Sequence, residues 1–153
     1  MFTILDAGPA ASALALRMER ATEISPDLLW EFVASCDRLR LLQSLGKALR
    51  FDALVAGGAF TEAALELVAI EAPQWSVQRL CRDNGEWFCA LSRHPDTPEW
   101  LDEAAEASHR SLPLAILGAL VEARARHNAA PAQEPLTSGH PRGGVPSDCD
   151  DYR

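Results

Sequence analysis

Apolar residues recur at helical spacing through most of the first seventy positions of the chain. The clearest helix start is Ser25-Pro26-Asp27, where a capping serine precedes a proline at the first helical position. Apolar residues continue with the same spacing from there, so the pattern predicts one helix over about 26–45. It also predicts helices over about 9–21 and from Thr61 to a stop at Pro73.

The stretch from Gln74 to Ser92 changes to a strand pattern. Two runs of strand-forming residues flank Asp83-Asn84-Gly85, a sequence typical of a tight turn. The pattern therefore predicts an antiparallel β-hairpin with apolar side chains on both faces. Because an isolated two-stranded hairpin is marginal in water, it must pack against helices, a third strand or a second copy of the chain.

Two registers of this hairpin are compatible with the residues at its turn. A two-residue loop, Asn84-Gly85, places Arg82 opposite Trp87, whereas a three-residue loop, Asp83–Gly85, places Arg82 opposite Glu86. The second register is favoured because it pairs opposite charges and gathers most of the large apolar residues on one face. The residues on that face would be Trp75, Val77, Cys81, Trp87, Cys89 and Leu91.

The chain beyond the hairpin returns to a helical pattern. A short acidic helix is predicted around Pro98 to Ala107, and a nearly all-apolar helix follows Ser111 and should lie at the centre of the core. Phe2 to Leu5 is the one other short strand candidate. We therefore predict an α+β fold, mainly helical, with one short antiparallel hairpin, and a third strand as an option, packed between helices.

The domain organisation follows from length and from a shift in composition near the end of the chain. A chain of 153 residues with 48% hydrophobic residues is expected to form one core. Residues 128–153 are rich in Pro, Gly and Ser and hold almost no large apolar residue. The sequence thus predicts a single domain over 1–127 and a disordered tail over 128–153.

The charge argues against ordinary nucleic-acid binding. The net charge is −8, and it is −1 over residues 1–60, −5 over 61–127 and −2 over the tail. A phosphate backbone would be repelled by most of such a surface. No apolar run is long enough to span a membrane, and the first residues lack the basic start of a signal peptide. We expect a cytoplasmic protein without membrane contact.

Neither the cysteines nor the histidines form a recognisable metal or catalytic motif. The four cysteines show no CxxC pair, and free thiols are the favoured interpretation over two disulfides. A zinc site would require Cys81, Cys89, His94 and His109 to converge after folding. No GxSxG or phosphate-binding glycine loop is present. We therefore predict no cofactor, no metal and no enzymatic activity.

Two regions are candidates for binding a protein partner. Trp100 lies beside Glu99 and near Glu103, and an aromatic residue with neighbouring acids suits a basic partner. The second candidate is the hairpin edge, with Arg79 and Arg82 as contact residues. An unpaired edge also predicts a homodimer formed by strand pairing.

The second half of the chain resembles a family of small proteins. The order over about 60–127 is helix, hairpin, acidic spacer and an Ala-rich helix, and it resembles the phage ABA-sandwich domain of phages and integrated phage regions. The residues that carry the resemblance are Trp75, Gly85, Trp87, Leu114, Ala115, Ile116 and Ala119. The same region also looks like small uncharacterised proteins of rhizobial genomes. The resemblance implies neither an activity nor a catalytic residue, and it leaves the first 58 residues unaccounted for.

The sequence leads to three function hypotheses from different classes. The favoured one is a non-enzymatic protein-interaction module of phage or mobile-element origin. The alternatives are an acidic inhibitor that mimics nucleic acid, directed at a DNA-binding protein, and an enzyme acting on a small substrate.

Overall fold

The computed structural model describes residues 9–94, 96, 98 and 103–129, which form six helices and one antiparallel sheet. This confirms the predicted α+β, mainly helical class. In chain order the elements are α1 (Pro9–Arg20), α2 (Pro26–Val33), α3 (Asp37–Ser44), α4 (Leu49–Ala56), α5 (Phe60–Glu71), β1 (Ser76–Asp83), β2 (Glu86–Ser92), β3 (Ala105–His109) and α6 (Leu112–Ala129).

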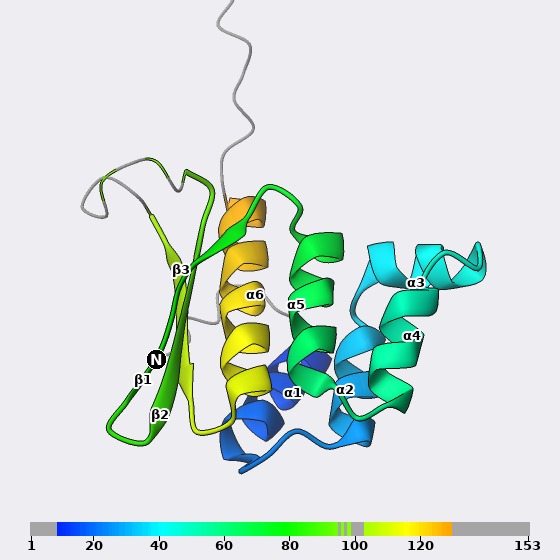
Figure 1. Cartoon of the computed structure of the whole chain (residues 1–153), viewed down its shortest axis with the longest axis horizontal. Coiled ribbons are helices and arrows are strands. Elements are labelled where there is room, and N and C mark those ends of the chain that lie inside the picture. The colour runs from blue at the N-terminus through cyan, green and yellow to red at the C-terminus, as the bar shows by residue number, and fades with distance from the viewer. Residues whose placement is uncertain (1–8, 95, 97, 99–102, 130–153) are drawn as a thin grey trace, which may run out of the picture.

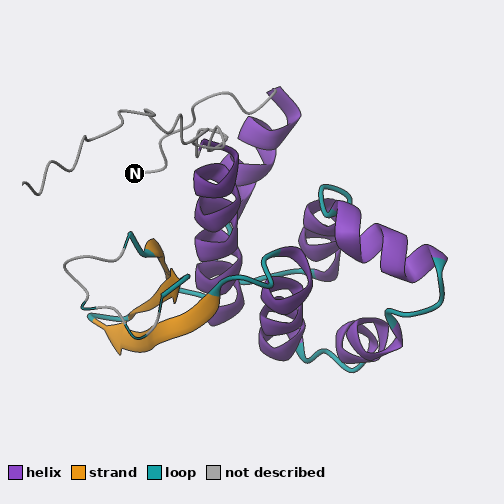
Figure 2. Ribbon diagram, turned by 90° about the horizontal axis from the view of Figure 1, so that it is seen from above, coloured by secondary structure: helices purple, strands orange, loops and turns teal. Residues whose placement is uncertain are grey.

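The sheet forms one outer layer of the molecule, and the described helices lie on one side of it (Figure 1). Its strand order is β1-β2-β3, so β2 is central and β1 is an edge. Helix α6 packs on β2 and β3, and α5 packs on the far side of α6. Helices α2, α3 and α4 extend away from the sheet beyond α5, as the second view shows (Figure 2). The hairpin is thus a side layer and does not lie between helices.

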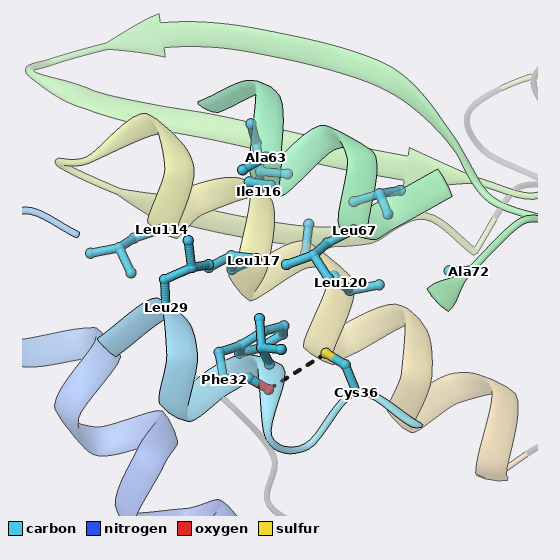
Figure 3. Close-up of a cluster of buried hydrophobic side chains, with 14 of the residues drawn as sticks. Leu29, Phe32, Cys36, Ala63, Leu67, Ala72, Leu114, Ile116, Leu117 and Leu120 are labelled. Carbon is cyan, nitrogen blue, oxygen red and sulfur yellow. Dashed lines mark hydrogen bonds between the residues drawn. The ribbon is translucent and has the colours of Figure 1, made fainter. Parts of the chain in front are cut away.

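Helix α6 is the centre of the hydrophobic core, as its apolar sequence predicted. Every residue from Leu114 to Leu120 is buried. Leu117 and Leu120 point toward Leu67 of α5 and toward Leu29 and Phe32 of α2 (Figure 3). This helix therefore joins the sheet to the helical half of the chain, and both halves share one core.

The single helix predicted over 26–45 is in fact two helices. Ser25 accepts a hydrogen bond from the backbone N–H of Leu28 and begins α2 as predicted, but α2 ends at Val33. The Ser35 hydroxyl donates to the carbonyl oxygen of Phe32 at 2.6 Å, and Cys36 then adopts extended backbone before α3 starts. Local hydrogen bonds of this serine compete with helix continuation, and the regular apolar spacing conceals the break.

The acidic helix predicted around 98–107 is also wrong where the structure describes it. Residues 105–109 form β3, which pairs antiparallel with β2. Ala105 and Ala107 are buried, whereas Glu106 and Ser108 are exposed, so the period is two. Alanine and glutamate favour helix in isolation, but pairing with β2 and packing against α6 outweigh that propensity.

Several sequence predictions lie outside the described residues. They include the weak strand from Phe2 to Leu5 and the disordered state of most of the tail. Helix α6 reaches Ala129, two residues past the predicted domain boundary.

The hairpin has the two-residue turn, so the favoured three-residue register is wrong. Arg82 pairs with Trp87, and Asp83 pairs with Glu86. Asn84 and Gly85 both have positive φ angles, 49° and 84°, which is the geometry of a type I′ turn. The register shifts between Val77 and Arg79, so Gln78 is the extra residue of a β-bulge.

The bulge explains why the apolar pattern misled the register. Because Gln78 is unpaired, Val77 and Leu80 lie on the same face although they are three residues apart. Their partners across the hairpin are Leu91 and Cys89, which both belong to the core. Strict alternation places these apolar residues on opposite faces, and this made the other register look better.

Candidate functional site

Strand β1 is the part of the sheet that is least covered by the rest of the chain. All of its eight residues are exposed or half-buried, whereas the last four residues of β2 are buried. The main contacts of α6 with the sheet are to β2 and β3. An edge strand has backbone N–H and C=O groups that no neighbouring strand pairs, so β1 is a template for an added strand.

The two faces of β1 differ in chemistry. Val77 and Leu80 lie on the face directed toward α6, and about two fifths of each side chain remains exposed, 40% and 38%. Cys81 and Arg79 lie on the opposite, outer face, where their partners on β2 are Phe88 and Ala90. The edge therefore combines an apolar face with a polar one.

Arg79 stands at one end of a row that crosses the sheet. Ala90 separates it on β2 from Glu106 on β3. Arg79 and Glu106 are both exposed, whereas Ala90 between them is buried. The outer face thus has opposite charges at its two edges, and the positive one belongs to β1.

Arg82 occupies the apolar face of β1, near the turn. Its guanidinium lies 5.8 Å from the ring centroid of Trp87, its cross-strand partner. A cation over an aromatic face at this separation is attracted by the ring quadrupole. Arg82 is therefore held against the hairpin, and Arg79 is the more open of the two predicted contact residues.

The predicted site residues do not all come together. Arg79 and Arg82 share β1 but project from opposite faces. Glu103 is exposed in the irregular segment that precedes β3. Glu99 and Trp100 lie outside the described residues, so the second predicted binding region has no structural description.

The cysteines named for a zinc site are separated by the sheet. Cys89 pairs with Leu80 and lies in the core, whereas Cys81 pairs with Phe88 and projects from the outer face. One ion cannot be bound by both thiols. Within the described part of the chain, no three His, Cys, Asp or Glu side chains are grouped for a metal ion.

His109, the histidine of the proposed zinc set that lies in a strand, has a structural role. Its Nδ1 accepts a hydrogen bond from the backbone N–H of Ser111 at 2.9 Å, which leaves the proton on Nε2. That Nε2 lies 3.0 Å from the carbonyl oxygen of Met18, to which it donates. His109 therefore ties the sheet to α1 and orients the start of α6.

Two buried cysteines are inert thiols. Burial raises the pKa of Cys36 to about 11, and the nearby Glu71 carboxylate adds to the increase. Burial alone raises the pKa of Cys89 to about 11. A thiol must ionise to act as a nucleophile, so neither residue is activated near neutral pH.

A cavity of about 330 Å³ lies where α3 begins and α5 and α6 end, and its walls carry both charges. Glu71 and Arg124 in its lining hold the junction between α2 and α3. Glu71 Oε1 accepts from the Leu39 backbone N–H at 2.7 Å, and Arg124 Nη2 donates to the Ser35 carbonyl oxygen at 2.8 Å. Both charged groups are engaged in hydrogen bonds that hold the fold together. The cavity is therefore a weaker candidate site than the edge strand β1.

Val77 and Leu80 are exposed apolar residues of the candidate edge that the sequence did not single out. The favoured register assigned Val77 to the face expected to dock on helices and Leu80 to the opposite face. The sequence did contain one signal for an exposed edge. No other predicted strand was placed beside the outer edge of β1.

No family model, curated protein or solved structure matches the chain significantly. Among the described residues, no helix has the length and apolar character that crossing a bilayer requires.

Proposed function

We propose that the chain is a non-enzymatic protein-interaction module that binds an extended segment of a partner along β1. The observation that carries the proposal is the exposure of β1 on both faces, together with its place at the edge of the sheet. Adding a strand to such an edge would pair the outward backbone groups of β1 and cover Val77 and Leu80.

The opposite edge of the same sheet is less suited to this role. Strand β3 has five residues against the eight of β1, and it packs on α6. Its exposed residues are Glu106 and Ser108, whose side chains are polar. Short edges resist strand addition, whereas a long edge with exposed backbone groups and apolar side chains among its charged ones is more open to it. The asymmetry supports β1 as the binding edge.

In strand addition, backbone hydrogen bonds provide affinity and the alternating side chains provide specificity. A segment that binds β1 would meet Val77 and Leu80 on one face and Arg79 and Cys81 on the other. We therefore propose a partner strand with apolar residues on one face and an acidic residue opposite Arg79.

A second copy of the chain meets the requirement for an acidic residue opposite Arg79. Antiparallel pairing of two β1 strands about Cys81 places each Arg79 opposite Asp83 of the other copy. Opposite charges across strands contribute about 0.2–1 kcal/mol for each pair. The two Cys81 residues would then face each other directly, within the range that a cross-strand disulfide requires. We propose this homodimer as one form of the interaction.

The homodimer is tested by oxidative cross-linking in a Cys149→Ser background. Cys36 and Cys89 are buried, so rapid cross-linking should depend on Cys81 alone. Sedimentation should show a dimer that is lost in the Val77→Lys/Leu80→Lys variant. A strict monomer at high concentration would remove the homodimer but not the partner-binding function.

The wider function is tested by capturing partners from a lysate with the wild type and with Val77→Lys/Leu80→Lys. Leu16→Lys is the matched control because Leu16 is similarly exposed but lies on α1. We expect the edge variant alone to lose the partner. Equal capture by all three proteins would contradict binding at β1. The phage or mobile-element origin is a separate part of the proposal, which genome neighbourhood tests.

A further inference from the structure

One short segment opposes the acidic character of the chain. Residues 38–50, RLRLLQSLGKALR, hold four bases and no acid. The segment carries +4 in a chain of net charge −8, so the other residues together carry −12. A charge balance taken over residues 1–60 conceals this segment, because acids on either side cancel it.

The same segment holds the most exposed large apolar residues that the structure describes. Leu41 is 60% exposed, Leu45 57% and Leu49 73%. Leu41 lies on α3, Leu45 follows one turn later as the C-cap residue of that helix, and Leu49 begins α4. We call residues 38–50 the basic-leucine tip. It lies on the helical half of the molecule, away from the sheet (Figures 1 and 2).

The fold holds these leucines outward. Leu39 and Phe51 are fully buried and occupy the inward positions of α3 and α4. Between the helices, Lys47 N–H donates to the Leu42 carbonyl oxygen at 2.8 Å and Gly46 N–H donates to that of Gln43 at 3.0 Å. This is a Schellman motif, and Gly46 has the positive φ, 66°, that the motif requires. The tip is therefore a rigid corner.

The bases of the tip are only loosely engaged by the protein itself. Arg50 Nε lies 3.5 Å from Glu66 Oε2, while 79% of the Arg50 side chain is exposed. Arg40 Nη1 reaches the Ala34 carbonyl oxygen at 3.5 Å, at the limit of a hydrogen bond. Exposed contacts of this kind are weak, so both guanidinium groups are able to bind an external anion.

We propose that the basic-leucine tip docks on the surface of an anionic lipid bilayer. Leu41, Leu45 and Leu49 would enter the headgroup region, with Arg40, Lys47 and Arg50 at the lipid phosphates. Leucines flanked by Lys and Arg are the combination that binds membrane interfaces. The −12 carried elsewhere would be repelled by the same surface and would turn the tip toward it.

A bilayer fits the tip better than an acidic protein does. The tip is a protruding helical corner, whereas helices bind proteins by lying in an apolar groove. Its exposed apolar residues are all leucines, and leucine is under-represented among the residues that dominate protein interfaces. The proposal departs from the expectation of no membrane contact, which rested on the absence of a spanning segment. Docking at the surface requires no such segment.

Vesicle flotation tests the proposal with the full chain. We expect the protein to float with vesicles of equal parts phosphatidylcholine and phosphatidylglycerol and to stay behind with phosphatidylcholine alone. Arg40→Gln/Lys47→Gln should weaken binding about 25-fold, since each base near an anionic surface is worth about fivefold. Leu41→Gln/Leu45→Gln/Leu49→Gln should reduce binding at least tenfold.

Matched variants elsewhere on the surface control for charge and hydrophobicity. They are Arg20→Gln/Arg110→Gln, at the end of α1 and between β3 and α6, and Leu16→Gln on α1, and both variants should float as the wild type does. Absence of flotation, or equal losses in the control variants, would overturn the proposal. A third result would also overturn it: the leucine variant binds as tightly as the wild type does, both to vesicles and to polyglutamate. Charge alone would then explain the binding, as it would for an acidic protein partner.

Discussion

At the residue scale, the most consequential contact is the one between Glu71 and the start of α3. No side chain of α3 or of its N-cap residue Cys36 caps the helix, and Glu71 supplies the acceptor from the end of α5. A carboxylate at a helix N-terminus both satisfies a free N–H group and interacts favourably with the helix dipole. The two residues are 32 positions apart, so no local sequence pattern announces this contact.

The Glu71 contact predicts a graded effect on stability. Glu71→Ala should lower the free energy of unfolding by about 1 kcal/mol, because the Leu39 N–H loses its partner. Glu71→Gln should cost less, because the amide oxygen remains an acceptor. Urea denaturation measures both variants. Equal stability of Glu71→Ala and the wild type would show that the contact does not stabilise the fold.

The two buried thiols predict a loss of stability at alkaline pH. Their pKa rises from 9.0 to about 11 on folding, so the unfolded thiols ionise first as the pH increases. The stabilisation is complete below pH 9 and is lost as the pH rises toward 11, by about 3 kcal/mol for each thiol. Denaturation of the wild type and of Cys36→Ala/Cys89→Ala, followed from pH 8 to pH 10.5, measures this difference. The variant should show the shallower decline, and parallel declines would contradict the assignment.

At the element scale, the sequence predicts where helices and strands occur better than how they are joined or paired. The N-cap at Ser25, the stop at Pro73 and a turn within Asp83–Gly85 are local signals, and each is found where it was expected, although the turn is the two-residue form that was not favoured. The bulge at Gln78 and the pairing that makes 105–109 a strand depend on residues distant in sequence. The candidate edge was predicted in outline, but its apolar face depends on that bulge.

The type I′ turn predicts different effects for substitutions at its two central residues. Gly85→Ala should destabilise the chain by about 1 kcal/mol or more, because alanine is strained at a φ of 84°. Asn84→Gly is the matched variant and should be close to neutral, since glycine readily adopts a φ of 49°. Thermal unfolding compares the two. A neutral Gly85→Ala would contradict the turn and the register that depends on it.

At the scale of the whole molecule, the fold leaves two unlike surfaces at its ends. Helix α6 fills the middle, the uncovered strand β1 lies on the sheet side, and the basic-leucine tip lies on the helical side. The acidic balance of the chain predicts neither surface, because net charge averages over both. Burial of individual residues, which only the folded chain shows, distinguishes them.

We propose above all that β1 is the strand to which a partner adds. Amide hydrogen exchange along Ser76–Asp83 tests it directly, measured for the free chain and for the complex formed with a second copy or a captured partner. We predict that exchange in β1 slows on binding while exchange in β3, the opposite edge, stays unchanged. A complex in which β1 exchanges as fast as in the free chain would contradict the account.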